Sequence, residues 1–310
     1  MAASTRNGYL GTIKAFCGWL ARSGRLIENP LAEMQKADQT SDRKHVRRAL
    51  TVGEVGRLLQ AARLRPIAEL GRQSVPLAEE DKYGRSSWTF ESLTSTNFDA
   101  CYRRGLAKLT DSPRRQVELE QLGRQRALFY HLAVSTGLRR KELASLTIGQ
   151  LHLEAIPAPY VDLAAKDAKS GRGACLPLRP DVVAELRAHL RHLGKDPSLA
   201  QRLFNSAPAI RVFDADCRAA GIAKTDTRGR VVDIHALRTT FCTHLAVAGV
   251  HPRVAQQAMR HSRMELTNQY YTDPILLDVA GAVNSLPTFT DLRAGVEASR
   301  ASKRSSSSAS

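Results

Sequence analysis

The most regular pattern of apolar and polar positions lies near the end of the chain, between Asp233 and Asp273. Apolar residues recur there at helical spacing, at Leu237, Phe241, Leu245 and Ala248 and again at Val254, Ala258 and Met259. Gly249 is placed to end the first helix, and Pro252 to begin the second. This stretch therefore predicts a helix, a short turn and a second helix.

The same spacing predicts helices elsewhere, over residues 5–22, 51–62, 96–109, 127–134, 180–190 and 210–220, and a short one that turns Leu143 and Leu146 inward. Thr51 and Glu54 form a capping box at the start of one of them. Two short runs, Tyr160–Leu163 and Ala174–Leu178, predict the strands of a hairpin. The fold class expected is mainly α with a small antiparallel β-hairpin or sheet (α+β). Between Leu64 and Arg124 the pattern weakens, and no chemistry is assigned there.

The helix over residues 5–22 has an apolar face that a single helix cannot bury. It packs either on the later domain or within a helical domain of which it is the last piece, and we favour the second. Lys36–Arg48 is polar and predicts a linker. The expected organisation is a remnant of a helical domain with its linker over 1–45, a main domain over 46–290, and a Ser-rich disordered tail over 291–310.

Lys and Arg number 46 against 30 Asp and Glu, for a formal net charge of +16. This excess favours a nucleic-acid partner over the alternatives of a ribosomal or a membrane-surface protein. The five cysteines are scattered without zinc-ligand spacing or a disulfide framework. No apolar run reaches the ~20 residues of a membrane span. We therefore expect a soluble, cytoplasmic protein with reduced cysteines and no membrane partner.

Polar residues whose side chains could take part in a reaction lie among the apolar positions near the end of the chain. His235 and Arg238 stand three residues apart, His261 follows, and Tyr270 and Tyr271 form a pair. Arg is permanently charged and bonds two phosphate oxygens at once, and His can accept a proton near neutrality. An enzyme needs these groups to attack a phosphodiester with a tyrosine and without a metal.

Five short motifs in this order make the chain resemble the tyrosine recombinase (phage integrase) family. They are Thr136-Gly137-Leu138-Arg139 with Glu142 and Leu143, Lys169-Ser170-Gly171 ahead of Leu176-Pro177-Leu178, His235-Ala236-Leu237-Arg238, Arg260-His261-Ser262, and Tyr271-Thr272-Asp273. The resemblance covers roughly Arg48 to Asp273 and implies that family's catalytic domain, preceded by the end of a helical core-binding domain. In two respects the chain departs from the family: residues 64–124 are longer than usual, and Arg260 stands where many members have Gly.

The resemblance implies a role for six catalytic residues: Arg139, Lys169, His235, Arg238, His261 and Tyr271. The two arginines bind the non-bridging oxygens of the scissile phosphate, where negative charge gathers. Tyr271 is the nucleophile and His261 its proton-accepting neighbour. Tyr270 competes for the first role, but the following Thr272-Asp273 favours Tyr271.

Lys169 and His235 complete this implied set. Lys169, in the basic turn of the hairpin, is the general acid for the leaving 5′-oxygen, with Lys166 as the fallback. His235 bonds the phosphate or accepts a proton from the nucleophile. His244 and His251 have no motif around them and are expected to be structural.

The activity implied is cutting and rejoining of DNA through a covalent 3′-phosphotyrosine, with no cofactor and no metal. The partner implied is double-stranded DNA, bound by a homo-tetramer that is monomeric when free. Two other interpretations stay open. Thr243–Met259 also fits a helix-turn-helix, which would make the protein a non-catalytic DNA-binding regulator. A type IB topoisomerase would use the same residues as a monomer.

Overall fold

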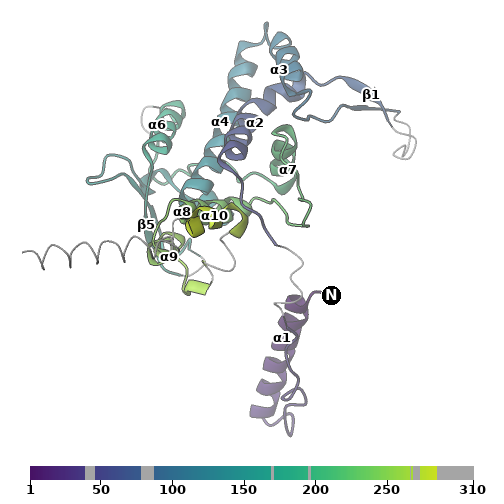
Figure 1. Ribbon diagram of the computed structural model, residues 1–310, viewed down its shortest axis with the longest axis vertical. Helices are drawn as coiled ribbons and strands as arrows, with labels where there is room; N and C mark the ends of the chain where they lie inside the picture. The colour runs from purple at the N-terminus through teal and green to yellow at the C-terminus, as the bar shows by residue number, and fades with distance from the viewer. Residues whose placement is uncertain are drawn as a thin grey trace, which may run out of the picture.

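Helices make up most of the described chain, with two small antiparallel sheets beside them (Figure 1). The computed structural model describes residues 1–38, 46–77, 87–168, 171–194, 197–265, 267 and 273–284. The α-helices are α1 (Ala3–Arg22), α2 (Val52–Leu70), α3 (Phe98–Ala107), α4 (Pro113–Thr136), α5 (Arg140–Ser145), α6 (Pro180–Leu193), α7 (Ile210–Ala219), α8 (Ala236–Val247), α9 (Pro252–Met259) and α10 (Val279–Asn284). The strands are β1 (Ser74–Pro76), β2 (Trp88–Phe90), β3 (Leu151–His152), β4 (Tyr160–Leu163) and β5 (Ala174–Pro177), and short 3₁₀ turns span Ile148–Gln150 and Pro274–Leu276. The mainly α fold with a small antiparallel sheet is confirmed.

Helix α2 packs against both α3 and α4 and forms the centre of the helical body. Its capping box is formed as predicted, because the Thr51 side chain accepts from the Glu54 amide and the Glu54 carboxylate accepts from the Thr51 amide. Glycines allow close approach on both sides. A Cβ at Gly123 of α4 would lie 1.9 Å from the Arg63 carbonyl oxygen, and one at Gly105 of α3 would lie 2.1 Å from that of Ile67.

A buried carboxylate joins α7 to the same helices. Asp216 of α7 is fully buried and accepts from Arg65 Nε of α2 at 2.6 Å. From α4, the Tyr130 hydroxyl donates to it at 2.8 Å and Arg126 Nη1 at 3.3 Å. Burial, together with the Asp216 charge and hydrogen bond, raises the pKa of Tyr130 far above its usual range. The three donors compensate the buried charge and fix α2, α4 and α7 together.

The predicted hairpin is present as β4 and β5, which pair antiparallel from Tyr160 opposite Pro177 to Leu163 opposite Ala174. Val161, Leu163 and Leu176 turn into the core, as the alternation of apolar positions requires. Strand β3 pairs with the other edge of β4. It was not predicted because two residues are too few to show a period of two.

The weakly patterned region from Leu64 to Arg124 contains more structure than its sequence indicates. Strands β1 and β2 pair there, and the pair projects from the helical body in Figure 1. Helix α4 begins at Pro113, whereas the sequence predicts only its second half, from Ala127. Its first half buries just Leu119 and Gly123 and exposes charged residues, so its apolar stripe is too narrow to recognise.

Helix α1 is present as predicted and stands apart from the helical body in Figure 1. One of its faces is held to the segment that follows it, where Asn7 bonds both the amide and the carbonyl of Ala37. Its other face exposes Tyr9, Phe16 and Trp19. This exposed apolar face agrees with membership of a larger helical unit, and that assignment stays a prediction, as do the domain limits at 1–45 and 46–290.

Ala248 at the end of α8 and Val254 in the first turn of α9 are exposed, although both belong to the apolar pattern of these helices. One expectation needs correction. The linker was predicted to reach Arg48, but Arg47 pairs with Val231 in a parallel β-bridge and forms an ion pair with Asp233 at 2.8 Å. The predicted tail over 291–310 lies outside the described residues.

Candidate active site

The first motif forms the turn between α4 and α5. Gly137 ends α4 with φ 62°, a left-handed conformation that glycine adopts without strain. A Cβ at this position would lie 2.6 Å from the Phe241 ring of α8, so the turn and α8 are in close contact. The chain leaves the turn at Arg139, whose extended backbone precedes α5.

Arg139 is held by one carboxylate at the start of α5. Glu142 Oε2 accepts from the Arg139 amide at 2.9 Å, and Glu142 Oε1 accepts from Arg139 Nη1 at 2.9 Å. The Arg139 side chain stays 25 % exposed, whereas that of Glu142 is almost fully buried. The buried Glu142 carboxylate therefore orients the Arg139 guanidinium, and solvent can still reach part of the Arg139 side chain.

Arg238 lies deeper, at 1 % exposure, on the first turn of α8. Its Nη1 donates to the carbonyl of Gly137 and its Nη2 to the carbonyl of Met259. The side chain thus joins the turn that precedes Arg139 to the end of α9, which precedes His261. A planar, permanently charged donor is suited to bridging two carbonyls in this way.

Both predicted histidines have lowered pKa values, caused first by burial and then by the charges of nearby arginines. Burial lowers the pKa of His261 to about 3, with the charges of Arg238, Arg139 and Arg260 as further causes. Burial likewise lowers the pKa of His235 to about 4, assisted by the charges of Arg47, Arg238 and Arg139, while Asp233 opposes the shift. His261 Nδ1 lies 3.0 Å from the Thr267 hydroxyl, which fixes the ring orientation. A neutral imidazole can accept a proton at neutral pH.

Four of the six predicted catalytic residues are therefore brought together: Arg139, His235, Arg238 and His261. Lys169 and Tyr271 lie outside the described residues, as does Tyr270. Lys166, the fallback for Lys169, is exposed in the loop between β4 and β5. His244 and His251, expected to be structural, both contact the main chain: His244 Nε2 lies 2.9 Å from the Leu50 carbonyl oxygen, and the His251 side chain caps α9.

Two acidic residues support the site in ways that the sequence did not indicate. Glu142 was noted only as part of a motif, although an acidic residue three positions after a helix start is a recognisable capping pattern. Asp273 served only to choose between the two tyrosines. It is buried and accepts from Arg230 Nη1 at 2.7 Å and from the Ala49 amide at 3.0 Å, while its own amide donates to Thr243 of α8. No local pattern predicts contacts over such sequence distances.

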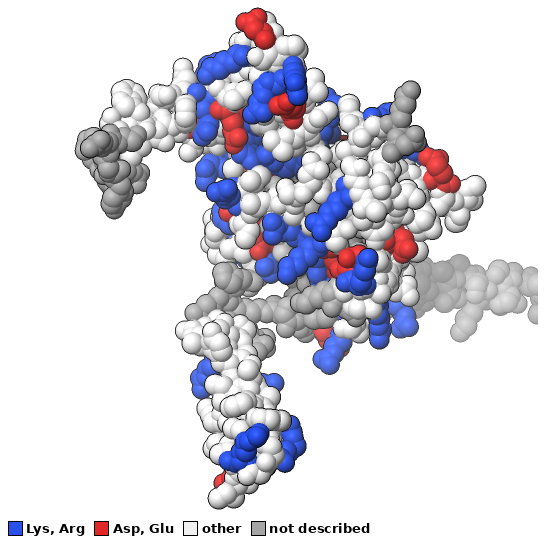
Figure 2. All heavy atoms as spheres, turned by 180° about the vertical axis from the view of Figure 1, so that it is seen from behind, with Lys and Arg blue, Asp and Glu red and all other residues white. Residues whose placement is uncertain are grey.

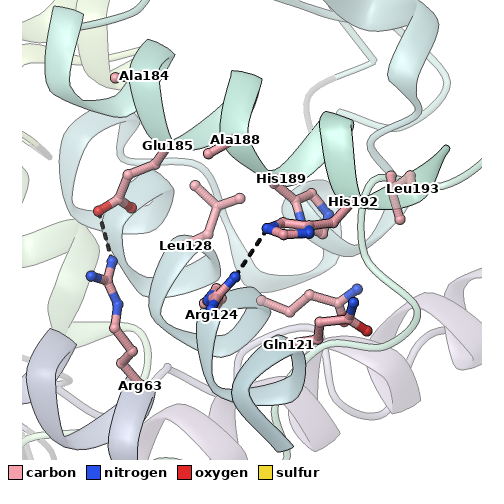
Figure 3. Close-up of a pocket in the computed structure, with 11 residues that line it drawn as sticks. Arg63, Gln121, Arg124, Leu128, Ala184, Glu185, Ala188, His189, His192 and Leu193 are labelled. Carbon is pink, nitrogen blue, oxygen red and sulfur yellow. Dashed lines mark hydrogen bonds and ion pairs between the residues drawn. The ribbon is translucent and has the colours of Figure 1, made fainter. Parts of the chain in front are cut away.

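A cavity of about 300 Å³ reaches Arg260 and is lined also by Ser135 and Thr136, by residues 174–177 of β5, and by Phe241, Val254, Gln257 and Ala258. A second cavity of about 390 Å³ lies where α2, α4 and α6 meet, and none of the predicted catalytic residues lines it. Figure 3 shows its interior, where Arg124 bonds His192 and Arg63 bonds Glu185. The predicted catalytic residues that the structure describes line neither cavity, although Arg260 of the first directly precedes His261 in the sequence.

In the described part of the chain, no group of three or more His, Cys, Asp or Glu residues is arranged to hold a metal ion. The described helices likewise include none that is long and apolar enough to span a membrane. The permanent positive charge at this site comes from Arg139, Arg238 and Arg260.

The chain matches the model of the phage integrase family over residues 108–274, which is more than half of its length. It belongs to this family. The matched region contains all the motifs named above, so the resemblance inferred from them is confirmed.

Two of the curated proteins similar to this integrase-family chain are a tyrosine recombinase of Pseudothermotoga lettingae, 28 % identical over 160 residues, and the tyrosine recombinase XerA of Pyrococcus furiosus, 27 % identical over 149 residues. The alignments cover 50 % and 46 % of this chain, and 51 % and 47 % of the relatives, so the chain spans about half the length of the curated relatives it matches.

Solved structures show the same fold. The XerH site-specific recombinase bound to a palindromic difH substrate, in a post-cleavage complex, gives a TM-score of 0.57 at 14 % identity and covers 92 % of this chain and 69 % of its own. A lambda integrase dimer bound to a COC′ core site gives 0.53 at 17 % identity, with 87 % and 74 % covered. At these identities the likeness concerns the fold of this integrase-family protein alone.

Proposed function

We propose that this chain is a tyrosine-type site-specific DNA recombinase that cuts and rejoins DNA through a covalent 3′-phosphotyrosine. The observation that carries the proposal is the convergence of Arg139, Arg238, His235 and His261, where both arginines lower the pKa of both histidines. The four residues come from three separate segments of a chain that belongs to the phage integrase family, with His235 and Arg238 together at the start of α8. Such a cluster provides fixed positive charge beside neutral proton acceptors, which is what phosphoryl transfer without a metal requires.

The proposed reaction uses each group once. The Tyr271 oxygen attacks the scissile phosphorus, the bond to the 5′-oxygen breaks, and a 3′-phosphotyrosine forms. Neutral His261 takes the tyrosine proton, and Lys169 gives a proton to the leaving 5′-oxygen. Arg139, Arg238 and His235 bond the non-bridging oxygens, where charge increases in the transition state. Attack by the 5′-hydroxyl of another strand reverses these steps and rejoins the DNA.

Double-stranded DNA is the proposed substrate, bound by a homo-tetramer that assembles on it. The formal net charge of +16 supports an anionic partner. Figure 2 shows Lys and Arg spread over the helical body and over α1 on the face opposite to that of Figure 1, with fewer acidic residues among them. The XerH and lambda integrase structures of the same fold are complexes with DNA sites by their own descriptions.

The alternative of a helix-turn-helix regulator is not favoured by the position of α8. The two helices and the turn at Gly249 are present, but α8 packs against α4 and buries Arg238, Thr239 and Thr240. A helix in this position belongs to the core, and its partner α9 ends at the candidate site. The proposal of a recombinase rather than a type IB topoisomerase rests on the two curated relatives, which are both named tyrosine recombinases.

A nicked suicide substrate tests the proposal, because it traps protein on the DNA 3′-phosphate once the leaving strand is lost. Wild-type protein should form the adduct. Tyr271→Phe removes one hydroxyl and should abolish the adduct while DNA binding persists, and Tyr270→Phe is the matched control that should form it. Loss of the adduct in Tyr270→Phe alone would move the nucleophile by one residue. Absence of any adduct from wild-type protein that binds the same DNA would refute the proposal.

A further inference from the structure

Arg260 occupies a position that disfavours arginine in two ways. Its backbone has φ 55° and ψ 39°, and it is the one non-glycine residue with positive φ in the described segments. Side chains with a Cβ adopt this left-handed conformation only at a cost in free energy, which explains why glycine suits the position. Its side chain is also 12 % exposed, and burial lowers its pKa. An arginine here therefore needs a compensating interaction.

That interaction is with Glu142, the carboxylate that orients Arg139. Arg260 Nη2 donates to Glu142 Oε2 at 3.0 Å, and Arg139 Nη1 donates to Glu142 Oε1 at 2.9 Å, so one carboxylate lies between two guanidinium groups. Burial alone would raise the pKa of Glu142, but the hydrogen bond from the Arg139 amide and the charge of Arg260 bring it below its usual range. Glu142 is therefore ionised.

The net charge of the cluster formed by Arg139, Glu142 and Arg260 affects how strongly it attracts a phosphate. Arg139 and Glu142 alone would form a pair with no net charge, and such a pair attracts an anion weakly. With Arg260 on the second oxygen, the cluster of two arginines and one glutamate carries one net positive charge. The Arg139 side chain remains 25 % exposed.

We propose that Arg260 is a positioning residue that neutralises Glu142, so that Arg139 is held in place by the carboxylate without losing its charge toward the scissile phosphate. This inference rests on the proposed function, since it names a residue that supports the same site. It predicts that a glycine at position 260 relieves the backbone strain and yet weakens the site.

The test compares single-turnover cleavage of a normal phosphodiester with cleavage of a methylphosphonate, in which a neutral methyl group replaces one charged oxygen. Arg260→Gly should slow cleavage of the phosphodiester by about tenfold or more, as loss of a partner that orients a reacting group does. The loss on the methylphosphonate should be several times smaller, and Arg260→Lys should restore most of the rate. Arg253→Gln, an exposed arginine on the same helix, is the control and should match wild type.

A second measurement does not require cleavage. Inorganic phosphate should raise the melting temperature of wild-type protein and Arg253→Gln, and should raise that of Arg260→Gly and Arg139→Gln less. If wild-type protein forms no adduct but this difference is found, the proposed function fails and the role of Arg260 stands. Equal phosphate shifts in wild type and Arg260→Gly, or equal slowing on both DNA substrates, would overturn the inference.

Discussion

Arg238 donates to the main-chain carbonyl of Gly137, a residue that lies 101 positions before it in the sequence. A second bond, to Met259, makes the same side chain the link between the two turns that present Arg139 and His261. The buried arginine is thus part of the framework of the site as well as of its proposed chemistry.

This double role predicts a contrast between two conservative substitutions. Arg238→Lys cannot bond both carbonyls at the same distance, and it should lower the free energy of unfolding by about 1.5–3 kcal/mol, as loss of a hydrogen bond to a charged group does. Arg139→Lys should change stability by less than about 1 kcal/mol, because that side chain is partly exposed. Both should slow adduct formation strongly. Urea denaturation together with single-turnover cleavage separates the effects, and equal stability of the two variants would contradict the structural role of Arg238.

The two buried histidines predict how stability depends on pH. Their pKa values in the folded protein, about 3 for His261 and about 4 for His235, lie below the value of about 6.5 expected in the unfolded chain. The unfolded chain therefore takes up more protons as the pH falls below about 6.5, and stability should decrease from there toward pH 4. Above about pH 7 both states hold these rings neutral, and the contribution is constant.

A histidine variant separates the contribution of His261 to the pH dependence of stability from the contribution of the Asp and Glu side chains. The difference in free energy of unfolding between wild type and His261→Asn should shrink as the pH falls from 7 to 4. A difference for His261→Asn that stays constant with pH would show that this ring is not held neutral by the fold.

The net charge of +16 predicts binding that depends on salt. Release of counterions from the DNA should lower the affinity by about 10³-fold or more between about 50 and 200 mM salt if six or more phosphates are contacted. Fluorescence anisotropy with labelled duplex DNA measures this slope, and Tyr271→Phe is used to avoid covalent trapping. Affinity that is unchanged across this range would argue against DNA as the partner.

Asp216 predicts a large loss of stability that has nothing to do with the chemistry. Asp216→Ala leaves Arg65 and Arg126 in the core without their shared carboxylate, and it should cost about 3–5 kcal/mol. Asp214→Ala, on the same helix, breaks a partly exposed pair with Lys224 and should cost about 1 kcal/mol or less. Chemical denaturation of the two variants provides the comparison. A small effect of Asp216→Ala would mean that α2 and α4 can rearrange around the loss.

Local patterns predicted most of the fold, because most of its helices carry a clear apolar stripe and recognisable end signals. The capping box at Thr51, the positive φ at Gly249 and the proline that begins α9 are each readable over a few residues. The first half of α4 was missed because it contacts its neighbours through Leu119 and Gly123, too few buried positions to show a helical period. Propensity and periodicity do not detect a contact made by the absence of a side chain.

The site was predictable to a similar extent and for a different reason. Arg139, His235, Arg238 and His261 were named from motifs, and the structure brings them together. The contacts that hold them could not be predicted, since the supporting bonds of Arg238, Glu142 and Asp273 join residues far apart in the chain. Arg260 was noticed as a departure from the family, but its bond to Glu142 depends on the left-handed end of α9, which only the folded chain reveals.

Asp273 has a consequence for how the protein is made. Its carboxylate accepts hydrogen bonds from the Ala49 amide and the Arg230 guanidinium. One carboxylate therefore joins residues that lie far apart in the sequence, on either side of the candidate-site residues. During synthesis the segment around Ala49 leaves the ribosome long before Asp273 does, and it must wait for its acceptor. A nascent chain therefore cannot complete these bonds until Asp273 has been translated. Translation products that stop before Asp273 leave the Ala49 amide and the Arg230 guanidinium without this shared acceptor.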